Sequence, residues 1–287
     1  MSFSFQPSHF PVIQGHRGAP LLGPENSVNA FQRAAEVGAE SIELDVFLSK
    51  DDNLVVFHGG KSASNPKEVG SLSGHTTSEK NIQDLSLDEI RALTFKTDSF
   101  ACPTKSMEGF YIPTLKEVLE DVVVENNMHV TIELKGSTTA KPVVQLLHTL
   151  RKKLDLKNQV TISSFNHNLL AQIKELDQTI NVATLFGKSI PDYAAVARQY
   201  HASEVHLSYK LVTKDIVDSL HQAGYIVMAW FSTPGSMEPG EEESHYLRLI
   251  QSGVDVICTN EPDTLVKKKP ELLNQLQLLD NHTIHKL

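Results

Sequence analysis

The sequence has little of what several classes of protein require. Only two of its 287 residues are cysteine, Cys102 and Cys258, too few for a disulfide framework and without the spacing of a metal site. We interpret both as free thiols of a reducing compartment, which predicts a cytoplasmic protein. No apolar run approaches the roughly 18–20 residues of a membrane span. Residues 1–11 also lack the basic start and apolar stretch of a signal peptide, so we expect a soluble protein.

Positive charge is also scarce. Lys and Arg number 26 against 35 Asp and Glu, which gives a formal net charge of −9. Such a chain has no long-range attraction for nucleic acid or anionic lipid headgroups, and we expect neither as a partner. An anionic small molecule would need a local positive field, from a metal ion or a few placed cations. The sequence leaves the oligomeric state open.

Short apolar runs alternate with helical patterns along the whole chain, which predicts a parallel sheet in an α/β fold. Eight such strand–helix units in about 250 residues are typical of a (β/α)8 TIM-type barrel. A doubly wound open sheet is the alternative, weakened by the lack of a Gly-rich dinucleotide loop. We expect one catalytic domain over residues 1–287. The predicted strands are 12–14, 41–48, 128–134, 159–163, 181–185, 204–207, 225–230 and 254–258.

Residues 49–112 interrupt this alternation after the second strand. A turn and a short strand over 54–58 come first, followed by a Ser/Gly/Asn-rich loop at 60–81 and a short helix that begins after Ser86. A long insertion at the strand ends of a barrel is typical of a functional cap. We therefore expect a hairpin and a cap-like insertion over 49–112. A disordered surface loop over part of 60–81 is the other interpretation.

Charged and aliphatic residues alternate in two of the predicted strands. Glu43 and Asp45 share one face of the second strand, and Glu133 and Lys135 share one face of the third. With the aliphatic faces against the helices, these four side chains point into the barrel, where each unpaired charge costs several kcal/mol. A hard cation with oxygen ligands, Mg²⁺ or Ca²⁺, would resolve this conflict. A Glu–Lys ion pair with solvated carboxylates is the alternative.

Three further polar residues lie at predicted strand ends, the side on which barrel active sites are built. His16 and Arg17 follow the first strand, and His58 ends the strand at 54–58. Two imidazoles near a metal suit a general base and a general acid at neutral pH. The Arg17 guanidinium could bind an anionic oxygen in a bidentate manner.

These segments form an ordered series that covers about residues 13–265 and resembles the glycerophosphodiester phosphodiesterases. The series includes His16-Arg17-Gly18, Pro24-Glu25-Asn26-Ser27, Ile42-Glu43-Leu44-Asp45-Val46, Leu54-Val55-Val56-Phe57-His58, Ile112-Pro113-Thr114-Leu115, Ile132-Glu133-Leu134-Lys135, Ser163-Ser164-Phe165 and Thr259-Asn260-Glu261-Pro262-Asp263. The resemblance implies a distorted (β/α)8 barrel with an insertion after the second strand. It also implies a full set of site residues: Glu43, Asp45 and Glu133 on a divalent metal, His16 and His58 as the catalytic pair, and Arg17 and Lys135 on the phosphate.

The sequence departs from the family beside His58. The family usually has His-Asp there, a short step before an Arg-Thr-Thr block, whereas this chain has His58-Gly59-Gly60, a longer loop, and His75 where the Arg would fall. The missing Asp puts the position of His58, the rate and the substrate range in question. Trp230, the only tryptophan, ends the seventh strand, where relatives often carry a Trp near the substrate; a rim or core aromatic is the alternative.

The resemblance implies cleavage of a glycerophosphodiester to glycerol 3-phosphate and an alcohol. Attack by the glycerol 2-hydroxyl, which would give a cyclic phosphate, and attack by water both stay open. The alternatives are a phospholipase D-type or lysophospholipid phosphodiesterase, a non-catalytic phosphate-binding barrel and a metal-dependent sugar isomerase barrel. Two further features are interpreted as structural: His206 as a hydrogen-bonded histidine, and Glu241-Glu242-Glu243 as a solvated helix start favoured by the helix dipole.

Overall fold

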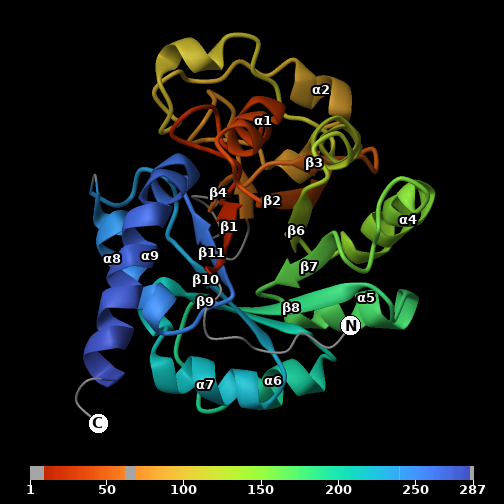
Figure 1. Ribbon diagram of the computed structural model, residues 1–287. Helices are drawn as coiled ribbons and strands as arrows, with labels where there is room; N and C mark the ends of the chain where they lie inside the picture. The colour runs from red at the N-terminus through yellow and green to blue at the C-terminus, as the bar shows by residue number, and fades with distance from the viewer. Residues whose placement is uncertain (1–9, 62–68, 239, 285–287) are drawn as a thin grey trace.

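In the computed structural model, which describes residues 10–61, 69–238 and 240–284, eight parallel strands surround one axis (Figure 1). The barrel is closed because β1 pairs with both β11 and β2. The prediction of a TIM-type barrel is therefore confirmed, and the open sheet is excluded. The strands are β1 (Val12–Gly15), β2 (Ser41–Leu48), β6 (His129–Leu134), β7 (Val160–Ser164), β8 (Asn181–Phe186), β9 (Glu204–Ser208), β10 (Ile226–Trp230) and β11 (Val256–Thr259).

Helices between the strands cover the outside of the barrel (Figure 1). Thr114 and Thr213 cap their helices by accepting hydrogen bonds from backbone amides in the first turn. None of the helices in the described part of the chain is long and apolar enough to cross a bilayer. The helices are α1 (Val28–Glu36), α3 (Leu115–Val118) with its π-helical continuation η3 (Leu119–Val124), α4 (Ala140–Leu150), α5 (His167–Leu176), α6 (Tyr193–Gln199), α7 (Lys214–Gln222), α8 (Glu241–Gln251) and α9 (Pro262–Ile284).

The alternation of side chains along β2 puts the apolar core on one face of the strand and the candidate site on the other. Ile42, Leu44 and Val46 of β2 are fully buried in the apolar layer between the barrel and its helices, which also contains Phe31 of α1 and Leu115 of α3. The intervening side chains of β2 point to the barrel interior, because successive residues of a strand face opposite sides. The same layer continues around the barrel under the remaining helices.

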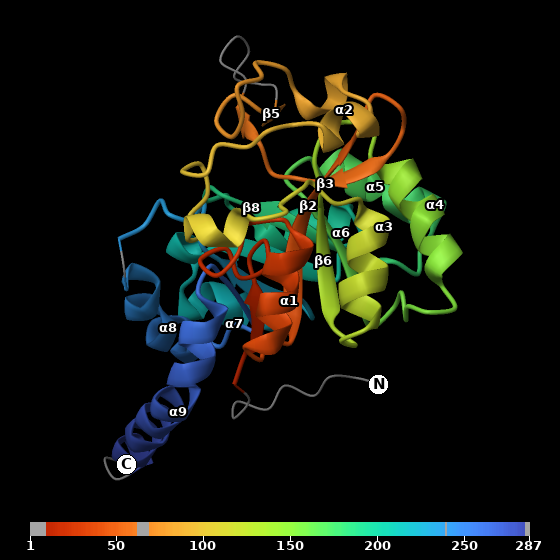
Figure 2. The same ribbon diagram turned by 90° about the horizontal axis from the view of Figure 1, so that it is seen from above.

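The described residues between β2 and α3 lie on one side of the barrel in both views (Figures 1 and 2). A separate apolar cluster holds it, in which Phe47 of β2 packs with Val55, Phe57, Leu72 and Ile82. The strand predicted over 54–58 ends at Val56, so His58 lies in the following loop, and residues 62–68 of the predicted loop lie outside the described residues. The elements here are β3 (Leu54–Val56), β4 (Gly60–Lys61), β5 (Val69–Ser71), η1 (Ile82–Asp84), α2 (Leu87–Arg91) and η2 (Thr104–Met107).

Candidate active site

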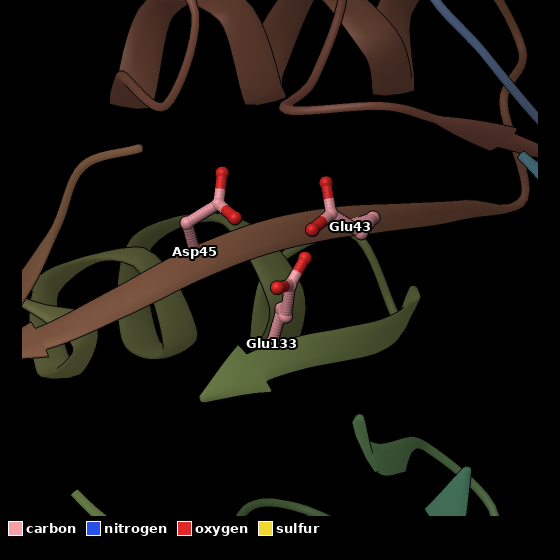
Figure 3. A group of neighbouring side chains, drawn as sticks. All are labelled: Glu43, Asp45 and Glu133. Atoms are coloured by element: carbon pink, nitrogen blue, oxygen red, sulfur yellow. The ribbon is translucent and has the colours of Figure 1, made fainter. Parts of the chain in front are cut away.

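Three buried carboxylates converge inside the barrel. Glu43 and Asp45 extend from β2, and Glu133 extends from β6, where it lies opposite Asp45 in the parallel register. One oxygen from each lies within 4.8 Å of the other two, and Figure 3 shows the three groups directed into one space. Side-chain alternation places Glu43 and Asp45 on the inner face of β2, and the pairing of β2 with β6 brings Glu133 beside them. An oxygen-only donor set of this kind suits Mg²⁺ or Ca²⁺.

The charges around these carboxylates are incompletely balanced. Lys135 Nζ lies 3.1 Å from an oxygen of Asp45 and 2.5 Å from one of Glu133. Burial, followed by repulsion from Asp45, raises the pKa of both Glu43 and Glu133. Burial also opposes ionisation of Asp45, but Lys135, His58 and Arg17 together hold the pKa of Asp45 well below its usual range. The neighbouring charges therefore stabilise the ionised form of Asp45. Ionised Glu43 and Glu133 would require additional positive charge.

A count of the ionisable groups supports a divalent cation. Arg17 pairs with Glu25 at 2.7 Å and with Asp45 at 3.3 Å. With all groups ionised, four negative and two positive charges leave a formal charge of −2, which one divalent cation would cancel. These groups are Glu25, Glu43, Asp45 and Glu133 against Arg17 and Lys135.

A strained loop after β1 holds the carboxylates of Glu43 and Asp45 in place. Arg17 and Asn26 both have left-handed backbones, with φ of 56° and 58°, and the Asn26 amide donates to the Arg17 carbonyl oxygen. The Arg17 backbone N–H donates to Glu43, while the side chain of Asn26 donates to Asp45 at 2.9 Å and accepts from the Asp45 amide. Such strain is concentrated at functional sites. Glu25 and Asn26 both lie in the motif Pro24-Glu25-Asn26-Ser27, but their contacts with Arg17 and Asp45 were not predicted from the sequence.

Both candidate catalytic histidines are in this cluster. His16 Nε2 lies 3.9 Å from an oxygen of Glu43. Burial, followed by the positive charge of Arg17, lowers the pKa of His16 to about 3 and that of His58 well below its ordinary value. Without bound substrate or metal, both imidazoles are therefore neutral at physiological pH and can accept a proton.

Comparison with known proteins decides what kind of barrel this is. The model of the glycerophosphoryl diester phosphodiesterase family matches residues 16–264. The chain belongs to this family. Membership places the chain among the phosphoric diester hydrolases, the enzyme class that the motif series predicts.

Two relatives of this phosphodiesterase match over almost their entire length. A glycerophosphodiester phosphodiesterase of Caldanaerobacter subterraneus subsp. tengcongensis is 30% identical over 256 residues, which are 89% of this chain and 96% of that protein. One from Bacillus altitudinis is 30% identical over 268 residues, 91% and 98% of the two chains. The fold also matches an Oleispira antarctica phosphodiesterase solved with its product sn-glycerol-3-phosphate, with a TM-score of 0.73, 24% identity and coverage of 89% and 95%.

The family's usual Asp after His58 would not fit this phosphodiesterase. Gly59 has a φ of +63°, and a Cβ built on it would lie 2.7 Å from Gly70 Cα and 3.0 Å from the ring of Phe57. The loop after His58 is therefore built around a close backbone approach that needs glycine. His75, at the position of the family's Arg, packs between the rings of Phe57 and Phe100 in the insertion.

Substitution Gly59→Asp is accordingly expected to destabilise the protein by about 1–3 kcal/mol, because it combines backbone strain with a steric clash. Urea unfolding measures this, and Gly74→Asp is the matched control, since a Cβ at Gly74 has nothing within 4 Å. If both variants unfold at the same urea concentration as the wild type, the loop does not depend on the Gly59–Gly70 contact.

Trp230 lies beside an aromatic residue that the sequence analysis did not single out. Its ring meets Phe165 edge-on, with centroids 5.7 Å apart, and Lys135 Nζ lies 5.9 Å from the centroid of the Phe165 ring. Phe165 is 48% exposed and lines an apolar hollow of about 540 Å³ together with Leu185 and Phe186. The aromatic pair thus lies between the charged cluster and an apolar surface. Only tertiary contact relates Phe165 to Trp230, since the two are distant in sequence.

Two other sequence predictions have different outcomes. His206 is buried and contacts Glu204 at 2.9 Å, which confirms a hydrogen-bonded structural histidine. The prediction of a solvated run at Glu241-Glu242-Glu243 is wrong for Glu242, which is 2% exposed. The first turn of α8 lies against the end of β11, so Glu242 accepts hydrogen bonds from Thr259 and Asn260. Burial raises the pKa of Glu242 to about 7.

Proposed function

We propose that this protein hydrolyses glycerophosphodiesters to glycerol 3-phosphate and an alcohol. The observation that carries the proposal is the buried triad of Glu43, Asp45 and Glu133 with two cations and two histidines, in a barrel of the phosphodiesterase family. A divalent cation, Mg²⁺ or Ca²⁺, would be held by the three carboxylates, where it supplies positive charge to a phosphoryl oxygen and lowers the pKa of a hydroxyl.

The protein's own residues bind and orient the phosphate. Arg17 is buried and Lys135 is mostly buried, and their ion pairs with carboxylates fix both cations at the cluster. Their positive charges would face the non-bridging oxygens of the substrate, where negative charge increases during the reaction. Phe165 and Trp230 would contact the apolar part of the substrate beside Lys135. With a divalent cation cancelling the formal charge of −2 of the cluster, these two cations would allow a chain with a net charge of −9 to bind an anion.

The two histidines would transfer the protons. His16 would accept the proton of the attacking hydroxyl, from the glycerol 2-position or from water, while the new P–O bond forms. His58 would donate a proton to the departing alcohol oxygen as the old P–O bond breaks. Both imidazoles are neutral in the free site, so His58 would first take up a proton from solvent, which a bound phosphodiester anion would favour, while His16 would stay neutral.

We assign this activity to one catalytic domain over residues 1–287, in which the insertion 49–112 would cap the site. His58 lies near the start of this insertion. The insertion packs on Phe47, which belongs to β2, the strand that carries Glu43 and Asp45. We also propose that the enzyme acts in the cytoplasm, because Cys102 and Cys258 are both buried free thiols.

Release of glycerol 3-phosphate from glycerophosphocholine tests the proposal. Turnover with Mg²⁺ or Ca²⁺ is expected to fall below detection with excess EDTA and to return when the metal is restored. Moderate salt should have a smaller effect, because the binding charges are buried and poorly screened. Turnover that survives exhaustive chelation would exclude the metal role.

A lysophospholipid phosphodiesterase is the second candidate, because the apolar hollow beside Phe165 could accept part of an acyl chain. Comparing kcat/KM for glycerophosphocholine and lysophosphatidylcholine separates the two. A higher value for the lysophospholipid would assign the enzyme to this second class.

A further inference from the structure

The end of β11 places an amide side chain against the candidate base. His16 Nδ1 lies 2.8 Å from Asn260 Oδ1, and both residues are buried. On its other side, Asn260 Nδ2 donates to the backbone carbonyl oxygen of Ser232 at 2.8 Å and to Oε1 of Glu242. His16 and Asn260 are held at adjacent strand ends, since the His16 amide donates to the Thr259 carbonyl oxygen.

These contacts determine which way the amide of Asn260 faces. A backbone carbonyl can only accept hydrogen bonds, so the group that contacts the Ser232 carbonyl oxygen must be the NH₂ of Asn260. The amide oxygen therefore faces His16, and an oxygen in this position accepts but cannot donate. His16 must then carry its proton on Nδ1, which leaves the lone pair of Nε2 directed toward Glu43 and the carboxylate cluster.

Glu242 reinforces the same orientation. Its Oε1 accepts from the Asn260 side chain, and its Oε2 accepts from the Asn260 backbone N–H at 3.0 Å and from the Thr259 hydroxyl at 2.5 Å. The Tyr246 hydroxyl contacts Thr259 Oγ1 at 2.7 Å and, because the Thr259 proton goes to Glu242, acts as the donor. The Thr259 hydroxyl, the Asn260 backbone N–H and the Asn260 side chain thus all donate to Glu242.

We propose that Glu242 and Asn260 are positioning residues, which hold His16 in the Nδ1–H tautomer and so make its Nε2 the base of the proposed reaction. The inference rests on the proposed function for the role of His16, but the tautomer itself does not. Neither residue touches the carboxylate cluster. The proposal assigns a role to the first turn of α8, which reaches the site only through β11.

The tautomer can be measured directly. Two-bond ¹H–¹⁵N correlation spectra of the histidine rings, recorded on the Mg²⁺-loaded protein with His16→Gln to assign the signal, should show His16 with an Nδ1 proton and an unprotonated Nε2. A His16 signal with the proton on Nε2 would overturn the proposal without any variant of Glu242 or Asn260.

Substitution Glu242→Gln tests whether Glu242 fixes the orientation of the Asn260 amide. Two donors still face the Oε2 position, so the new NH₂ must face the NH₂ of Asn260, and the amide of Asn260 loses its preferred orientation. We expect the Nδ1–H signal of His16 to be lost or mixed and kcat to fall about 10–100-fold, with KM little changed. Glu243→Gln removes the same charge from a half-exposed neighbour that pairs with Lys268, and it should leave both unchanged.

The double variant Glu242→Gln, Asn260→Asp restores the donor–acceptor order toward position 242 and toward His16, because the amide introduced at position 242 can donate to a carboxylate at position 260 that still accepts from His16. It does not restore the hydrogen bond to the Ser232 carbonyl oxygen, which a carboxylate cannot donate, so only partial recovery is expected. It should recover the Nδ1–H signal and part of kcat, which a purely structural role would not produce. An unchanged His16 tautomer in folded Glu242→Gln protein would show that Glu242 is not a positioning residue for His16. If His16→Ala retains activity, the catalytic role proposed for His16 is wrong even where the tautomer is as expected.

Discussion

Replacement of His16 by alanine is expected to lower kcat for glycerophosphocholine about 10²–10⁴-fold, the usual contribution of a general acid or base. The reason is the placement of the imidazole, whose Nε2 lies 3.9 Å from Glu43 inside the cluster. KM should change little, because Arg17 and Lys135 remain to bind the phosphate. Steady-state kinetics at saturating Mg²⁺ measures both constants.

His148→Ala is the control for this substitution, since His148 pairs with Asp177 at the surface and should not affect either constant. A raised KM with an unchanged kcat would instead assign His16 to substrate binding. Unchanged kinetics in a folded His16→Ala protein would exclude His16 from the proposed reaction.

Glu43→Gln is expected to remove metal-dependent activity and, at the same time, to stabilise the metal-free protein. Glu43 is buried beside Asp45 and Glu133, which together with burial raise its pKa. A neutral amide relieves this repulsion and still offers an oxygen to the Arg17 backbone N–H. In the wild type the bound metal should relieve this repulsion. At a metal concentration 100 times its Kd, binding should raise the free energy of unfolding by about 2.7 kcal/mol.

Thermal unfolding of the wild type and of Glu43→Gln, each in EDTA and in Mg²⁺, measures these changes in stability. The wild type should gain a large rise in Tm from Mg²⁺, whereas Glu43→Gln should begin higher in EDTA and respond weakly. Glu36→Gln removes an exposed carboxylate that pairs with Arg33 on α1, and it should respond to Mg²⁺ like the wild type. Equal responses of the wild type and Glu43→Gln would show that Glu43 is not a ligand.

Much of the site could be predicted because it depends on short-range backbone geometry. The alternation of β2 is sufficient to place Glu43 and Asp45 on one face and the aliphatic residues on the other. Charged residues on that inner face of a closed barrel must meet, and the structure brings Glu133 into contact with them. His16 and Arg17 could be placed for the same reason, since they directly follow a strand.

Contacts between distant segments could not be predicted in this way. Three consecutive glutamates look alike in the sequence, and only the packing of α8 against the end of β11 buries Glu242 and leaves its neighbours partly exposed. Gly59 is required because Gly70 lies against it, and Phe165 gains its position from Trp230 on another strand. The sequence by itself determined the barrel, the order of its strands and the inward carboxylates, through periodicities of two and 3.6 residues. The tertiary structure alone decided which loops and helix ends meet around them, because these contacts join segments that are distant along the chain and depend on how those segments pack.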